Sequence, residues 1–156
     1  MDRPAVLIRR LSEVPQHAPA IAQLVWAQGW ANNTLSPAEL AGRLRAQAGP
    51  GVPSTFVAEA DGRPLGTASL EPHDLPGRAD LSPWLANVVV VEAARGAGIG
   101  AMLVRRVERE AQAAGIARLW LYTRRARPLY LRLGWTDAFV TEAGGKEVFV
   151  MRRDLD

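Results

Sequence analysis

The sequence predicts an α+β fold. Apolar residues recur at helical spacing in some segments, and in others they alternate or run continuously over a few positions. Along the chain these segments read as one strand, two helices, three strands, a helix, a strand, a helix and two strands. At 156 residues, 48% apolar and 22% charged, the chain has the size and balance of one globular domain, which we expect to span residues 1–156.

The N-terminal half contains two local signals for element boundaries. Ser36, Pro37 and Glu39 have the spacing of a helix cap, a first-turn proline and the second member of a capping box. Asp61-Gly62 lies between two alternating segments and predicts a hairpin turn. The elements expected here are a strand at Ala5–Arg10, a helix at Ala18–Trp30, a helix from Ser36 to the Gly49-Pro50-Gly51 stop, and two strands within residues 54–71.

The C-terminal half begins with a strand, Trp84–Val91, whose continuous apolar run predicts burial on both faces. The helix that follows, Gly98–Ala114, has one apolar face and one charged face. The remaining expected elements are a strand at Ala117–Tyr122, a short helix at Arg127–Leu133, and strands around Asp137–Val140 and Glu147–Arg152 separated by Gly144-Gly145.

Composition excludes several kinds of chemistry. The chain has no cysteine and only two isolated histidines, so we expect neither thiol catalysis nor a metal site. No stretch approaches the ~20 apolar residues that span a bilayer, and the N-terminal segment carries charges where a signal peptide would be apolar. We therefore expect a soluble, cytoplasmic protein with no membrane partner.

The basic residues give little support for nucleic-acid binding. The formal net charge is only +3, and all but one of the 19 basic residues are arginines, the exception being Lys146. These arginines are dispersed along the chain and form no stripe, which disfavours a nucleic-acid partner.

The segment VVVVEAARGAGIGAMLV at 88–104 joins the apolar strand to the long helix through a glycine-rich turn. It satisfies a relaxed dinucleotide fingerprint, but the next strand ends in Leu121-Tyr122-Thr123, without the acidic residue that would hold a ribose. It fails as a Walker loop because Ala101-Met102 follow Gly100 where Lys and Ser or Thr are required. A strand, a turn with free amides and a helix N-terminus remain, which together suit a pyrophosphate, with Arg95 adding charge.

These residues resemble the GNAT superfamily of acyl-CoA-dependent N-acetyltransferases. Arg95-x-x-Gly98-x-Gly100 after a valine-rich strand resembles that family's pyrophosphate-binding motif, and Tyr130 followed by Gly134-Trp135 resembles its tyrosine-bearing helix. The resemblance runs from Trp84 to Trp135. It implies a mixed, mostly antiparallel sheet of six to seven strands with about four helices, splayed between the fourth and fifth strands.

The resemblance also implies acetyl-CoA as co-substrate, without a metal. Backbone groups of Val88, Val89 and Val90 would pair with the pantetheine arm, and the amides of Arg95, Gly96, Ala97, Gly98, Ile99, Gly100 and Ala101 would hold the pyrophosphate. The sequence departs from the family pattern at Glu92, where many members have proline, and at Thr123, where many have asparagine. The Thr123 hydroxyl would partly replace that contact to the cofactor arm.

Catalysis in such a site needs an oxyanion donor, an acid and a base. The backbone amide of Val89 or Val90 is the expected oxyanion donor, and Tyr130 is the expected general acid. Glu71, His73, Asp74 and Asp80 are the available bases in or beside the loop before Trp84, and we select Asp80 because it lies nearest to that strand.

The sequence leaves the acceptor open among small polyamines or aminoglycosides, amino acids, and protein or peptide amines. The side chains expected near its pocket, at the junction of the first two helices, are Trp26, Trp30, Asn32 and Asn33. The expected function is acetyl transfer to a primary amine. A non-catalytic acyl-CoA sensor of the same fold is the alternative, and homodimer formation stays open.

Overall fold

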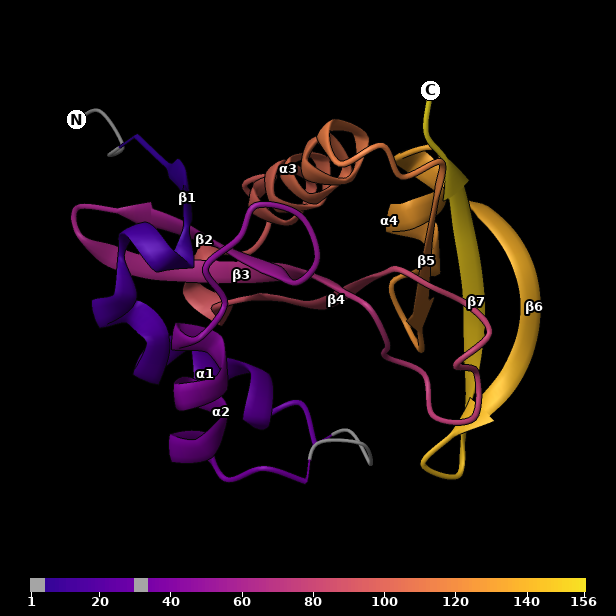
Figure 1. Ribbon diagram of the computed structural model, residues 1–156, viewed down its shortest axis with the longest axis horizontal. Coiled ribbons are helices and arrows are strands. Elements are labelled where there is room, and N and C mark those ends of the chain that lie inside the picture. The colour runs from indigo at the N-terminus through magenta and orange to yellow at the C-terminus, as the bar shows by residue number, and fades with distance from the viewer. Residues whose placement is uncertain (1–4, 30–33) are drawn as a thin grey trace.

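The computed structural model describes residues 5–29 and 34–156 and confirms the α+β fold, with helices on both faces of one sheet (Figure 1). The strands are β1 (Leu7–Arg10), β2 (Ser54–Ala60), β3 (Arg63–Glu71), β4 (Trp84–Val90), β5 (Arg118–Thr123), β6 (Thr136–Ala143) and β7 (Lys146–Asp154). The helices are α1 (Ala18–Trp26), α2 (Pro37–Arg45), α3 (Ile99–Ala113) and α4 (Arg127–Arg132), with short 3₁₀ segments at Leu11–Glu13, Pro15–His17 and Glu92–Ala94.

The predicted local signals have the expected geometry. The Ser36 side chain accepts from the Glu39 amide at 3.1 Å while the Glu39 carboxylate accepts from the Ser36 amide at 3.2 Å, so the capping box is complete. Asp61 and Gly62 have φ angles of 51° and 72°, the left-handed pair that a two-residue hairpin turn requires. Helix α1 is shorter than predicted and ends at Trp26.

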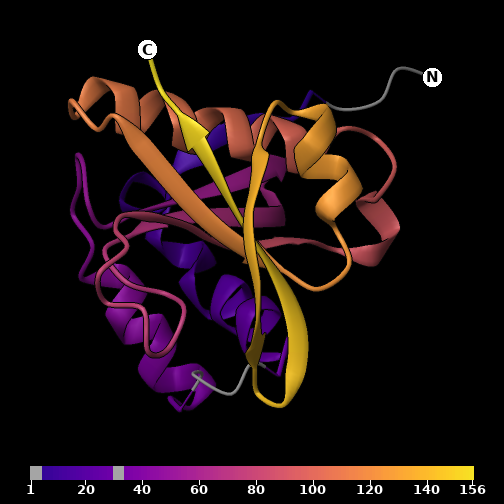
Figure 2. The same cartoon turned by 90° about the vertical axis from the view of Figure 1, so that its right-hand side faces the viewer.

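Two of the three apolar clusters among the described residues lie on opposite faces of the sheet, beneath the helices that Figure 2 shows there. On one face α3 and α4 pack against the central strands, with Leu103 and Val107 of α3 fully buried. On the other face α1 and α2 pack over Val57 of β2. Within residues 5–29 and 34–156, none of the helices has both the length and the hydropathy to cross a bilayer.

The sheet is continuous in order but divided in its middle. Its strand order is β1-β2-β3-β4-β5-β7-β6, and every neighbouring pair is antiparallel except β4 and β5. These two run parallel and pair only at Trp84 and Trp120, after which they diverge (Figure 1). The splay implied by the family resemblance is therefore present, and it leaves one edge of β4 open.

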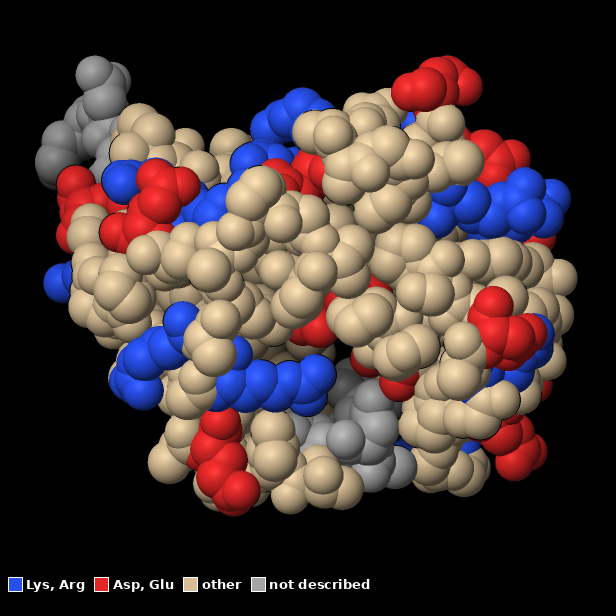
Figure 3. Space-filling model, in the orientation of Figure 1, with Lys and Arg blue, Asp and Glu red and all other residues tan. Residues whose placement is uncertain are grey.

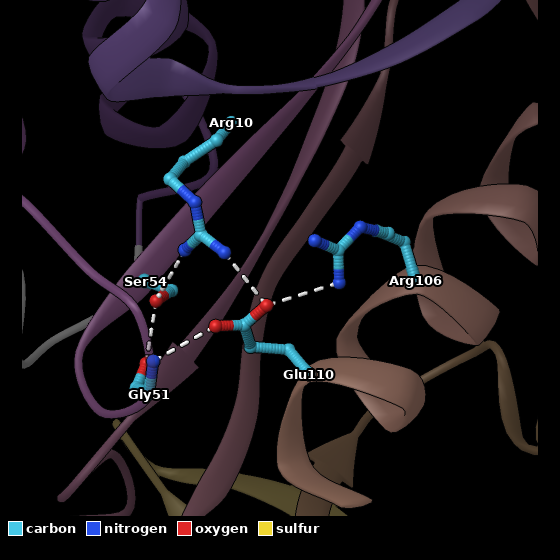
Figure 4. A network of polar contacts seen from close by, with 5 residues as sticks. All are labelled: Arg10, Gly51, Ser54, Arg106 and Glu110. Atoms are coloured by element: carbon cyan, nitrogen blue, oxygen red, sulfur yellow. Dashed lines mark hydrogen bonds and ion pairs between the residues drawn. The ribbon is translucent and has the colours of Figure 1, made fainter. Parts of the chain in front are cut away.

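A polar network fixes the loop before β2 to α3 (Figure 4). The buried carboxylate of Glu110 accepts from Arg10 at 2.7 Å and from the Gly51 amide at 2.8 Å, and it pairs with Arg106 at 3.1 Å. Arg10 also donates to the Ser54 hydroxyl at 2.9 Å. One carboxylate on α3 thus holds β1 and the loop that leads into β2.

Candidate active site

A cavity of about 560 Å³ lies where β4 and β5 diverge, on the face covered by α1 and α2. Four of the residues predicted to form the site line its wall: Val88, Val89, Thr123 and Tyr130. Val90 and the loop from Arg95 to Ala101 are not in that wall, and all of this loop except Ile99, Gly100 and Ala101 is exposed. The predicted site is therefore divided between an enclosed part and a surface loop joined to it by the end of β4.

The direction of the peptide groups along β4 follows from its pairing with β3. The Val91 amide donates to the Leu65 carbonyl at 2.8 Å, which makes these two residues a hydrogen-bonded pair. Because such pairs alternate along antiparallel strands, the peptide groups of Val89 face β3 and those of Val90 face the cleft. The Val90 carbonyl accordingly accepts a side-chain hydrogen bond from Arg95 at 3.0 Å.

A β-bulge interrupts β4 beside the cavity. Between two regular pairs, Ala68 of β3 faces both Asn87 and Val88 of β4. Asn87 has a φ of 57°, a left-handed conformation that asparagine tolerates better than most residues. The bulge turns β4 at the cavity wall, and by the same alternation the peptide group of Val88 faces the cleft. Of the two predicted oxyanion donors, Val90 presents its peptide groups to the cleft and Val89 presents them to β3.

The glycine loop presents unfilled space and free amides. Gly96 and Gly98 have φ angles of 82° and 81°, and a Cβ placed on either would meet nothing within 4 Å. Gly98 is the N-cap of α3 and supplies no side-chain acceptor for the first amides of that 15-residue helix. These amides and the positive end of the helix dipole together suit an anionic ligand.

Tyr130 lies on α4 with its ring against Trp135, at 6.1 Å between centroids and an interplanar angle of 66°. The side chain is buried, and this burial raises the pKa of Tyr130 to about 12. Its hydroxyl has no hydrogen-bond partner among the described residues. Tyr130 is thus a protonated phenol at the wall of the cavity with its donor available.

Thr123, at the end of β5, is buried, and its hydroxyl oxygen accepts from the Ala126 amide at 3.1 Å. This bond caps the turn into α4 and leaves the hydroxyl proton for a second contact.

Asp80 does not line the cavity. Its side chain is 62% exposed, and both carboxylate oxygens accept from Arg78 at 2.9 Å. The hydrogen bond from Arg78 holds the pKa of Asp80 below its ordinary value, which makes it a poorer base. Sequence proximity to Trp84 selected Asp80, but the intervening loop directs it to the surface.

Glu71, at the end of β3, is buried in the wall of the cavity, unlike the exposed Asp80. It lines the cavity and is only 6% exposed, and burial raises the pKa of its carboxyl group despite a hydrogen bond from Gln47 and the charge of Arg43. The Gln47 amide donates to it at 3.1 Å, while the Gln47 carbonyl accepts from Thr55 at 2.6 Å. From the sequence alone, Glu71 was only one of four available bases, and no local pattern marked Gln47 as its partner.

None of the four residues predicted to lie near the acceptor pocket is placed in the cavity wall by the described structure. Trp26 is 45% exposed and does not line the cavity, whereas Trp30, Asn32 and Asn33 lie outside the described residues. The helical side of the cavity is formed by other residues: Val25, Gln28, Leu40, Arg43 and Leu44. The described residues contain no group of three or more His, Asp or Glu side chains that could hold a metal ion.

Solved structures share this fold over nearly the whole chain. An acetyltransferase of the GNAT family from Streptococcus pneumoniae is 22% identical, with a TM-score of 0.75 over 97% of this chain and 100% of that one. The yncA structure from Salmonella typhimurium, with its cofactor acetyl-CoA, is 20% identical, with a TM-score of 0.76 over 97% and 95% of the two chains. A ribosomal-protein-alanine N-acetyltransferase from Brucella melitensis is 21% identical, with a TM-score of 0.74 over 96% and 99%.

At these identities the structural similarity shows the fold alone, and comparison with curated protein sequences gives no significant match. The family is shown by the sequence itself, because the model of the acetyltransferase (GNAT) family matches residues 19–135. That match includes the splayed strands, the glycine loop and α4. The chain therefore belongs to the GNAT family of acetyltransferases.

Proposed function

We propose that this protein transfers an acetyl group from acetyl-CoA to a primary amine by direct attack. The observation that carries the proposal is the open edge of β4, which leads from the glycine loop at the surface into a cavity containing Tyr130 and Glu71. An extended pantetheine arm could pair with that edge at Val90, while the amides of the loop bind the pyrophosphate. Thr123, on the facing strand, would donate its free hydroxyl proton to the same arm.

The residues of the cavity can support each step of the transfer. The amine nitrogen attacks the thioester carbon, and the carbonyl oxygen becomes an oxyanion that the Val88 amide, directed into the cleft, would stabilise. The carbon–sulfur bond then breaks, and Tyr130 donates to the departing sulfur. Glu71, directly or through a water, accepts the proton that the amine loses. In this proposal the base is Glu71, in place of the sequence-based choice Asp80, and the oxyanion donor is Val88, in place of Val89 or Val90, whereas Tyr130 keeps its expected role.

A sensor that binds acetyl-CoA without turnover is the second candidate, and two measurements separate it from an enzyme. Thermal unfolding in the presence of acetyl-CoA, CoA, nicotinamide dinucleotides and nucleic acid tests the ligand. Thiol release with a panel of amines tests turnover. Stabilisation by both CoA species with turnover supports the enzyme, and stabilisation without turnover supports the sensor. Stabilisation by nicotinamide dinucleotides alone would contradict both.

The glycine loop provides a first prediction. Gly98→Val is expected to abolish the thermal stabilisation by CoA, because the added side chain occupies the open space at the N-terminus of α3. Gly115→Val is the matched control, since Gly115 also has a left-handed φ, of 76°, and open space beyond it, but lies at the opposite end of the same helix. Both variants should lose similar stability without ligand. Equal CoA stabilisation in the two would disprove the role of the loop.

A second prediction concerns Glu71. Glu71→Gln is expected to lower turnover by about 10²-fold or more, since the amide cannot accept the proton of the amine. The same variant should melt at a higher temperature than the parent at neutral pH, as measured by thermal unfolding. The reason is that the raised pKa of Glu71 makes its burial favourable below the ordinary value of 4.5 and progressively unfavourable as pH rises through the folded value.

Asp80→Asn is the control for this prediction, because Asp80 is exposed and outside the cavity. It should leave turnover within about twofold of the parent, as for most surface substitutions. The loss of turnover in Asp80→Asn but not in Glu71→Gln would restore the sequence-based choice of base.

A further inference from the structure

The inner part of the cavity carries charges of both signs. Its acidic lining residues are Glu71 and Asp74, and its basic ones are Arg43, Arg124 and Arg125. Figure 3 shows basic and acidic side chains facing each other across a hollow below the middle of this face. The lining therefore has three cationic groups against two carboxyl groups, and one of these carboxyl groups is buried.

Arg43 differs from the other charged residues of α2 in its position. It lies in the last turn of the helix, where its exposed side chain lines the main cavity and also a smaller adjoining one. Its charge acts on Glu71, which lines both cavities too. Among the described residues, however, Arg43 has neither a hydrogen bond nor an ion pair with a carboxylate. Its guanidinium is thus available to a ligand that lies beside Glu71.

The orientation of Glu71 is fixed by a chain of hydrogen bonds. Thr55 donates to the Gln47 carbonyl at 2.6 Å, so its hydroxyl oxygen must accept in its 2.8 Å contact with Ser69. Every donor in this chain points toward the Glu71 carboxylate, which accepts from Gln47 at 3.1 Å. Glu71 is therefore held by neutral groups and is not neutralised by Arg43.

We infer that the acceptor is an amine bearing an anionic group close to the nitrogen, as in a free amino acid, with Arg43 binding the anion; this inference rests on the proposed acetyl transfer. The reactive form of an amine is the deprotonated one. An amino acid in that form is an anion, which matches a cavity lined by more cationic than anionic groups. A diamine or an aminoglycoside still carries positive charge after losing one proton, and the same lining repels it. Arg43 supplies a planar pair of donors for a carboxylate.

The test compares acceptors with and without a free carboxylate, and it compares Arg43, which lines the cavity, with Arg45, which does not. With the full chain and acetyl-CoA, thiol release is measured for free L-amino acids, for the corresponding amino-acid amides, for linear diamines and for a short peptide. Free amino acids should have the highest kcat/KM. Arg43→Ala should raise KM for them about 10-fold to 100-fold with little change in kcat, the loss typical of a hydrogen bond to a charged group, and should leave the amides unaffected. Arg45→Ala, on the same turn but outside the cavity, should change neither.

The outcomes separate this inference from the function on which it rests. Preference for diamines or the peptide would overturn the inference and leave the acetyl transfer in place. An equal loss on all acceptors in Arg43→Ala would also overturn it, because a structural role of Arg43 would not distinguish acids from amides. Binding of acetyl-CoA with no turnover of any amine would overturn the proposed function itself. As a readout without turnover, free amino acids should further stabilise the CoA complex of the parent but not that of Arg43→Ala.

Discussion

Replacing Tyr130 by phenylalanine is expected to lower turnover about 10-fold to 100-fold while leaving acetyl-CoA affinity nearly unchanged. The pKa of Tyr130, raised by burial to about 12, makes this phenol a weaker acid than a thiol, whose pKa is about 8.5. Tyr130 therefore acts mainly by donating a hydrogen bond to the departing thiolate, and the expected loss is that of a hydrogen bond to a charged group.

Folding stability provides the control for this substitution. The Tyr130 hydroxyl has no described partner, so phenylalanine keeps the contact with Trp135 and leaves no donor or acceptor unpaired. The melting temperature should stay the same or rise slightly. Thiol release and cofactor titration on both proteins make the measurement. If turnover survives intact, Tyr130 only packs against Trp135, and the donor to the sulfur lies elsewhere.

Replacing Glu110 by alanine is expected to produce the largest loss of stability, about 3 kcal/mol. The substitution leaves Arg10, Arg106 and the Gly51 amide without their shared acceptor, and removing one partner of a buried ion pair typically costs about 3–5 kcal/mol. We expect the lower end of this energy range because the side chains of Arg10 and Arg106 are 17% and 26% exposed, so water can hydrate them in the variant. For a chain of this size, the melting temperature should fall by roughly 6–12 °C.

The pH dependence of this stability loss tests whether the Glu110 carboxylate is its cause. Burial alone would raise the pKa of Glu110, but the hydrogen bonds from Arg10 and Gly51 hold it below the ordinary value of 4.5. Its stabilisation is therefore present above pH 4.5 and is lost as pH falls through the lowered value. The difference between parent and Glu110→Gln should shrink on acidification, and Gln112→Ala on the exposed side of α3 should change little. A stability difference between the parent and Glu110→Gln that did not change with pH would show that the charge of Glu110 is not responsible.

The parts of the molecule that were predictable from sequence depend on residues close together in the chain. The capping box of Ser36 and Glu39 and the Asp61-Gly62 turn each satisfy backbone groups within a few positions, and the glycine loop takes its left-handed turns at Gly96 and Gly98, two positions apart. The motif around Gly98 also carried the family resemblance, and with it the splayed sheet. Local patterns therefore predicted the loop that lies on the proposed cofactor side of the site.

The acceptor side depends on register and on distant segments. Peptide groups alternate between the two edges of a strand, so the directions of the Val88, Val89 and Val90 amides needed the pairing with β3 and the bulge at Asn87. The choice of Glu71 over Asp80 needed the path of the loop between β3 and β4, which no local pattern encodes. Arg43 became relevant only because α2 packs over the same cavity.

The divided sheet also determines what joins the two halves of the molecule. Backbone pairing between β4 and β5 is confined to Trp84 and Trp120, whereas the apolar core under α3 includes Phe56 and Leu85 from one half and Leu121 and Met151 from the other. This apolar packing is not directional, and it is supplemented by directed contacts of Glu108 on α3 with Trp135 at 3.1 Å and Arg153 at 3.2 Å. A ligand that pairs with the open edge of β4 would therefore bridge the two halves at the place where β4 and β5 diverge.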